Sequence, residues 1–231
     1  MPRDWSGGHS QARDAKTKAR LRRGVRAEHD SLGTVLRLVR GGDAVTRPEL
    51  EQRSGLGRAT IADRVATLID RGLLEEGPLK ASSVGRSPRQ LRFRAEAGVV
   101  LVAYARTTTL GVAIADLAGN LLVEHHEPSD IAVGPTRTLD RLTALFDWVL
   151  EEHQDGRPVW AIAIALPAPV EQVTGTPFGT SVIHGLPSWE GFPVGQVLTK
   201  RYGVPVWLDT DAHLMALAEL RAGRGVGNRD L

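Results

Sequence analysis

Residues 57–74 read GRATIADRVATLIDRGLL, and the spacing of the apolar residues predicts one amphipathic helix. Ile61, Val65 and Leu68 repeat at helical intervals, so they form the stripe expected to be buried. The opposite face is polar and is expected to lie in solvent. It consists of Arg58, Thr60, Asp63, Arg64 and Thr67.

Two further helices are predicted in front of this segment. The first repeats apolar residues at helical spacing through residues 32–39 and ends at a Gly-Gly pair. The second begins with a capping box of Thr46 and Glu49, so it extends over about residues 47–53. The sequence SGLG then forms a tight turn before the long helix.

A basic hairpin is predicted directly after the long helix. Residues 73–94 predict two strands joined by a loop that carries Lys80, Arg86 and Arg89. A short helix, a turn, a helix that exposes Arg and Thr, and a basic hairpin are typical of a winged helix-turn-helix. Its helix reads base edges in the major groove, and its hairpin contacts phosphates or the minor groove. We therefore expect a double-stranded DNA operator as partner, with Arg47 as a further contact. A three-helix interaction module with solvated arginines is the alternative.

The charge is divided unevenly along the chain. Residues 1–94 carry 20 of the 29 Lys and Arg but 11 of the 27 Asp and Glu, a net charge of +9. Residues 95–231 carry the remaining 9 Lys and Arg and the remaining 16 Asp and Glu, a net charge of −7. Such asymmetry indicates a module that binds nucleic acid joined to a part with another role, although a basic tail on an ordinary protein gives the same pattern. Residues 1–26 predict a flexible basic arm, and residues 27–94 predict the winged helix.

The second half predicts an α/β fold, so the whole chain combines an α+β winged helix with a ribonuclease-H/actin-like lobe over residues 98–231. Three β-branched runs joined by short turns predict an antiparallel meander over residues 98–127. A helix from Pro135 and the buried, parallel strand VWAIAIALP follow. After a Pro- and Gly-rich loop at residues 168–191, a helix, a strand and a helix complete the pattern.

The composition excludes several classes of protein. The chain has no cysteine, which excludes disulfides, cysteine-based zinc sites and thiol catalysis within these residues. It has no apolar run of roughly 20 residues, and its N-terminus lacks the apolar core of a signal peptide. We expect a cytoplasmic, nucleoid-associated protein that does not interact with membranes.

Several segments resemble the ROK family of repressors and kinases. GRATIADRVATLIDRGLL followed by GRSPRQL is similar to the family's helix-turn-helix and wing, and LPAPVEQVTG is similar to its PGPV segment. GLPSWEGFPV resembles the loop before the sugar site, and VPVWLDTDAHLMALAELRAG resembles the strand and helix that carry an Asn-Asp pair. The family's regulators, among them those that control xylose or N-acetylglucosamine use, join a winged helix to this domain, whereas its stand-alone kinases lack the winged helix.

The resemblance implies a sequence-specific transcriptional regulator of carbohydrate metabolism genes, a repressor that responds ancestrally to a sugar or sugar phosphate. We also expect a homo-oligomer. A sugar kinase with an accessory DNA-binding domain and a degenerate protein-interaction module are the alternatives.

The resemblance implies no kinase activity. The family's Asp-x-Gly-Gly-Thr loop aligns with residues 104–108, where Tyr104 replaces the Asp on the metal side and side chains replace both glycines. A backbone without glycine cannot approach ATP phosphates closely. Asp211 occupies the position of the family's catalytic base, but no residue is expected to be catalytic.

The residues that align with the family's sugar site resemble the family more closely than the residues of the phosphate loop do. Thr210 and His213 replace two family asparagines around Asp211, whereas Gly185 replaces an asparagine that contacts sugar. We expect Thr210, Asp211, His213 and Trp189 to contact a ligand. Asp211 is also expected to be a helix N-cap, with or without ligand contact, and packing is the alternative role for Trp189.

No metal or cofactor is expected in these residues. Asp209, Asp211 and His213 form a cluster at one strand end, but no further ligands accompany them. The resemblance places the family's cysteine-rich zinc site in a second lobe that follows Leu231. The chain is therefore expected to be a fragment, a truncated product or a shortened relative.

Overall fold

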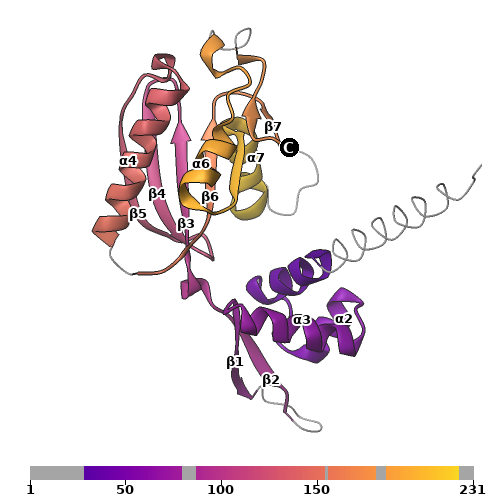
Figure 1. Ribbon diagram of the computed structural model, residues 1–231. Helices are drawn as coiled ribbons and strands as arrows, with labels where there is room; N and C mark the ends of the chain where they lie inside the picture. The colour runs from indigo at the N-terminus through magenta and orange to yellow at the C-terminus, as the bar shows by residue number, and fades with distance from the viewer. Residues whose placement is uncertain (1–28, 80–86, 154–155, 181–185, 224–231) are drawn as a thin grey trace, which may run out of the picture. The chain divides into compact units, whose positions relative to one another are not determined.

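The computed structural model divides the chain into two units, Met1–Arg94 and Ala95–Leu231 (Figure 1). It describes residues 29–79, 87–153, 156–180 and 186–223. The predicted arm at residues 1–26, the loop cations Lys80 and Arg86, and Gly185 lie outside the described residues.

Three helices form the core of the first unit. The N-terminal helix spans residues 29–40, α2 spans Arg47–Ser54 and α3 spans Arg58–Asp70. The predicted stripe of α3 is confirmed, because Ile61 and Val65 are inaccessible to solvent and Leu68 is buried as well. The predicted capping box is also confirmed: the Thr46 hydroxyl accepts from the Glu49 amide, and the Glu49 carboxylate accepts from the Thr46 amide.

Replacing Thr46 by alanine is expected to destabilise α2 by about 1 kcal/mol, because one amide of the first turn loses its acceptor. Hydrogen exchange at the amides of residues 49–51 in the full chain measures this effect. Thr67→Ala is the matched control, since its hydroxyl bonds only to the Asp63 carbonyl of its own helix. Equal protection in the two variants would contradict the capping role.

A two-stranded hairpin completes this unit, in the order of elements that the winged-helix prediction requires. β1 (Leu74–Leu79) pairs antiparallel with β2 (Arg89–Phe93). The chain before α2 joins the hairpin, because Thr46 forms a β-bridge with Gln90. The hairpin is therefore fixed to the start of α2.

The second unit contains one five-stranded mixed sheet with the strand order β5-β4-β3-β6-β9. The predicted meander is confirmed by the antiparallel strands β3, β4 and β5, and β6 and β9 continue the sheet in parallel with β3. The strands are β3 (Val99–Ala105), β4 (Thr109–Asp116), β5 (Leu121–Pro128), β6 (Val159–Leu166) and β9 (Val206–Thr210).

Helices α4 (Pro135–His153) and α6 (Val194–Tyr202) pack on the sheet and share its apolar core. Phe146 of α4 and Leu198 of α6 are both inaccessible to solvent in that core. Tyr202 joins the two helices by donating a hydrogen bond to Asp147. Burial raises the pKa of Tyr202 to about 12, so the hydroxyl keeps its proton. Helix α7 (Asp211–Ala222) contacts β6 and β9 but adds no residue to this core.

The predicted loop at residues 168–191 contains regular structure that its sequence did not indicate. A short hairpin, β7 (Val170–Glu171) and β8 (Thr176–Pro177), and a 3-10 turn at Pro187–Trp189 lie within it. Strands of two residues are too short to show alternation, which is why the pattern gave no signal. No helix within the described ranges is long and apolar enough to cross a membrane.

Candidate nucleic-acid interface and ligand site

A groove in the first unit brings together three of the predicted DNA contacts. Arg47 comes from α2, Arg58 from α3 and Arg89 from β2. The groove is lined by Arg47, Pro48, Glu51, Arg58, Ala62, Pro88 and Arg89. The three cations were predicted separately, and only the fold places them on one surface.

Each of these arginines is the first residue of its element. Arg47 follows the cap of α2, Arg58 follows the cap of α3, and Arg89 begins β2. The amide groups at a helix N-terminus carry partial positive charge, which adds to the charge of the arginines. The first turn of α3 contains no acidic residue that would cancel this charge, whereas the first turn of α2 contains Glu49. The groove therefore favours an anion such as phosphate.

One acidic residue contacts two of the groove arginines and was missed in the sequence. Glu76 of β1 accepts a hydrogen bond from Arg47 at 2.8 Å, and its second oxygen lies 3.7 Å from Nε of Arg89. Arg58 forms no ion pair within the described residues. In the sequence, Glu76 is one of two adjacent acidic residues in the predicted hairpin, Glu75 and Glu76, and this pattern indicates no partner for either.

The prediction that Arg64 lies on the exposed face of α3 is wrong. Its Nε donates to the hydroxyl of Ser31 on the N-terminal helix at 2.7 Å, and it pairs with Asp63. Only 16% of the Arg64 side chain is exposed, because it packs between two helices. Asp63 is exposed as predicted, whereas Thr60 and Thr67 are half-buried.

The predicted ligand residues of the second unit lie where β9 ends and α7 begins. Asp209 accepts from the Thr210 amide and contacts Nδ1 of His213 at 2.6 Å, which fixes the orientation of the imidazole. Asp211 accepts from the Ala212 amide at 2.8 Å. The expected N-cap is displaced by one residue, since Thr210 is the cap and Asp211 is the first residue of the helix. The carboxyl ends of parallel strands are a common ligand site in α/β sheets.

Trp189 does not belong to this ligand site, which corrects its place among the predicted contacts. Its side chain is only 2% exposed, and its indole N–H donates to the carbonyl of Ile131 at 3.0 Å. Neither face of the ring is open to a ligand. The alternative interpretation of Trp189 as a packed anchor for the long loop is the correct one.

Residues 104–108, the segment expected to align with a phosphate loop, begin with a packed aromatic side chain. Tyr104 lies opposite Gly111 in the β3–β4 pair, and its ring lies across that glycine. A Cβ at position 111 would lie 2.3 Å from Cε1 of Tyr104, so only glycine permits this packing. The guanidinium of Arg106 lies 5.1 Å from the centre of the same ring.

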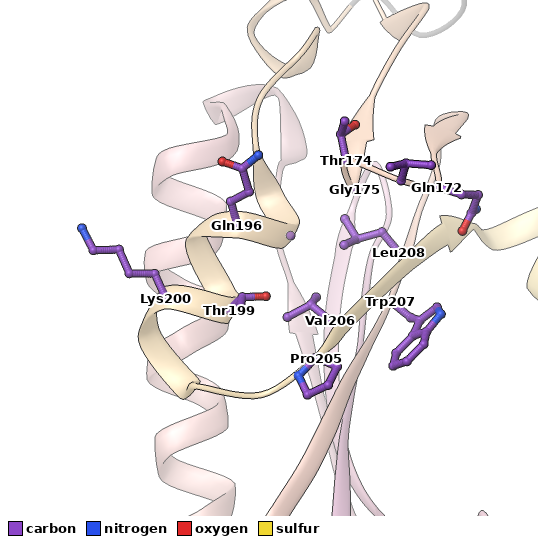
Figure 2. A pocket seen from close by; sticks show the side chains of 12 residues that line it. Gln172, Thr174, Gly175, Gln196, Thr199, Lys200, Pro205, Val206, Trp207 and Leu208 are labelled. Atoms are coloured by element: carbon purple, nitrogen blue, oxygen red, sulfur yellow. The ribbon is translucent and has the colours of Figure 1, made fainter. Parts of the chain in front are cut away.

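A second hollow lies between the β7–β8 turn, α6 and β9 (Figure 2). Lys200 and Trp207 point away from one another on opposite sides of it in Figure 2. None of the predicted ligand residues lines this hollow. The described part of the chain also holds no group of three or more His, Cys, Asp and Glu residues placed to bind a metal ion.

Comparison with known proteins agrees with this architecture. The chain is 28% identical over 205 residues to the DNA-binding transcriptional repressor Mlc of Escherichia coli, covering 86% of this chain and 48% of that protein. It is 21% identical to the xylose repressor of Caldicellulosiruptor bescii, covering 80% of this chain and 46% of that protein. The chain thus spans about half the length of these curated relatives.

The fold has a close counterpart among solved structures. A ROK family transcriptional regulator, a homologue of the E. coli Mlc protein, superposes with a TM-score of 0.72 at 23% identity, covering 87% of this chain and 50% of that one. The sequence model of the ROK family matches residues 106–230, more than half of the chain. The protein belongs to the ROK family.

Proposed function

We propose that this chain is a sequence-specific DNA-binding regulator whose winged helix docks on duplex DNA through the arginine groove. The observation that carries the proposal is the convergence of Arg47, Arg58 and Arg89 from three elements. Arg47 and Arg89 flank the start of α3, so they suit phosphates and fix how the helix enters the major groove. Arg58 is exposed and unpaired among the described residues, and it suits the O6 and N7 atoms of guanine.

Other residues of the first unit have supporting roles in this proposal. Asp63 is exposed on α3 and suits a cytosine amino group. Thr60 and Thr67 of α3 are half-buried and do not line the groove. Arg64 acts through its hydrogen bond to Ser31, by fixing α3 to the N-terminal helix.

The second unit is proposed to hold the effector. Thr210, Asp211 and His213 offer hydroxyl, carboxylate and imidazole groups at one strand end, and such groups bind sugar hydroxyls. The names of the relatives, a xylose repressor among them, support a repressor that responds to a sugar. A sugar phosphate as the effector and assembly as a homo-oligomer are further parts of the proposal. Effector and operator would then influence each other through a coupling free energy of about 1–3 kcal/mol.

We infer further that the chain does not transfer phosphate. The packing of Tyr104 across Gly111, with Arg106 over the ring, leaves side chains where ATP phosphates require a bare backbone. The top curated relatives are named as regulators, which supports the same conclusion.

The test is a titration of the full chain against a duplex selected from a random library, at several salt concentrations. We expect affinity to fall steeply with salt, because each phosphate contact releases about one counterion. The titration is repeated with a panel of monosaccharides and monosaccharide phosphates. A tenfold shift, about 1.4 kcal/mol, identifies the effector class. A salt-independent interaction, or selection that enriches no sequence, would contradict the DNA-binding proposal, and a panel without any shift would contradict only the effector.

A further inference from the structure

The ion pairs of Glu76 connect two elements of the arginine groove. One carboxylate oxygen contacts Arg47, the first residue of α2, at 2.8 Å, and the other lies 3.7 Å from Nε of Arg89, the first residue of β2. Glu76 accepts a hydrogen bond from one N–H group of Arg47 and forms an ion pair without a hydrogen bond to Arg89, whereas each guanidinium has five N–H groups. Most donors of both arginines remain available to another anion.

The position of Glu76 relative to the groove decides what it does. Arg47 and Arg89 line the groove, whereas Glu76 does not. Its carboxylate thus bridges the two guanidinium groups without lining the groove itself. We expect a phosphate in the groove to contact the N–H groups of both arginines that Glu76 does not use.

The backbone of the hairpin supports this placement. Glu76 is paired with Leu91, and the register changes directly afterwards, because Leu79 is the next residue paired, with Arg89. Three steps along β1 thus match two steps along β2, which is a β-bulge at Gly77 and Pro78. Proline lacks the N–H that a regular ladder needs, so a bulge is a favourable place for Pro78. The bulge brings the start of β2 beside Glu76.

We propose that Glu76 is a positioning residue for DNA binding, an inference that rests on the proposed function. Its carboxylate holds Arg47 and Arg89 at one spacing, so that both guanidinium groups meet the sugar-phosphate backbone without the cost of ordering two long side chains. The side chains of Arg47, Glu76 and Arg89 are 35%, 38% and 60% exposed. Ion pairs between side chains this exposed contribute little to the free energy of folding. We therefore expect replacement of Glu76 to change the affinity for DNA and not the stability of the unit.

Glu75 provides a matched control on the same strand. Successive side chains of a strand point to opposite faces, and Glu75 lies opposite Arg92 across the hairpin. It contacts Nε of Arg92 at 2.6 Å and Nε of Arg94 at 3.6 Å, and neither of these arginines lines the groove. Glu75→Gln and Glu76→Gln therefore change the net charge equally, and only the second affects the groove.

The experiment compares the full chain and both variants on a 30-base-pair duplex of random sequence at low salt. Glu75→Gln should bind as tightly as the parent or slightly more tightly, because one negative charge is lost. Glu76→Gln should bind about fivefold or more weakly than Glu75→Gln, because two arginines lose their order. Glu76→Asp keeps the charge but shortens the reach, and it should weaken binding as well.

A double-mutant cycle separates positioning from a general loss of structure. Arg47→Ala should cost less affinity in the Glu76→Gln background than in the parent, whereas Arg58→Ala should cost the same in both. If Glu76→Gln binds as tightly as Glu75→Gln, or more tightly, Glu76 does not position the arginines and instead competes with phosphate. A parent without salt-dependent binding overturns the proposed function together with this inference, whereas a parent that binds while the two Gln variants are equal overturns this inference alone.

Discussion

A chain carrying R47A, R58A and R89A together is expected to lose about a hundredfold or more of its affinity for the selected duplex. The salt dependence should also become shallower by about two units, because Arg47 and Arg89 are the proposed phosphate contacts and each lost contact removes about 0.9 from the slope. Arg58→Ala alone should cost about 1–3 kcal/mol on the selected duplex and less on random sequence, since a base contact carries specificity. Fluorescence anisotropy at four or more salt concentrations measures both quantities.

The control for this variant removes three exposed arginines of the same unit that do not line the groove, in R37A/R53A/R71A. Arg71 is informative because it caps the far end of α3, about 20 Å along the axis from Arg58. The control changes the net charge equally, so it should lower random-duplex affinity modestly and leave discrimination between sequences intact. If both triple variants lose the same affinity, the groove has no special role and only net charge matters.

Replacing Trp189 by alanine is expected to destabilise the second unit by about 3–5 kcal/mol. The substitution leaves a cavity in the core and removes one of the two donors to the Ile131 carbonyl, which keeps only its hydrogen bond from the Gly134 amide. Urea unfolding of the full chain, followed by circular dichroism, measures the loss as a lower midpoint.

Trp207 provides the comparison for this change, because it is 63% exposed in the same unit. Trp207→Ala should change stability by no more than about 0.5 kcal/mol. A Trp189→Ala variant as stable as Trp207→Ala would mean that the ring is not an anchor, and its role in ligand binding would have to be reconsidered.

Features that depend on local spacing could be predicted from the sequence. The helix predicted after the Pro- and Gly-rich loop is α6, because apolar residues repeat at helical intervals and Gly203 adopts a left-handed conformation that ends the helix. The capping box of α2 is likewise contained in four residues. The antiparallel meander could be predicted because each of its strands is long enough to show the apolar, β-branched composition that is typical of a strand.

The errors concern contacts between residues that are far apart in the chain. Arg64 does not lie on the exposed face, because it donates a hydrogen bond to Ser31, 33 positions away in the chain. Trp189 likewise donates to the carbonyl of Ile131, 58 positions away. A helical repeat indicates which side of α3 is apolar, but not which neighbour packs beside its edges. Glu76 was missed for the same reason, since its two partners belong to elements that the sequence does not place together.

The contact between Tyr104 and Gly111 couples the substitutions that these two facing positions accept. The ring of Tyr104 lies where a side chain at position 111 would begin, with Cε1 2.3 Å from the place of a Cβ. Any side chain at position 111 therefore requires the ring to move from its present place. Replacing Tyr104 by a small residue would in turn uncover the glycine. We therefore expect the effects of substitutions at the two positions to be non-additive, so that one change alters which residues the other position tolerates.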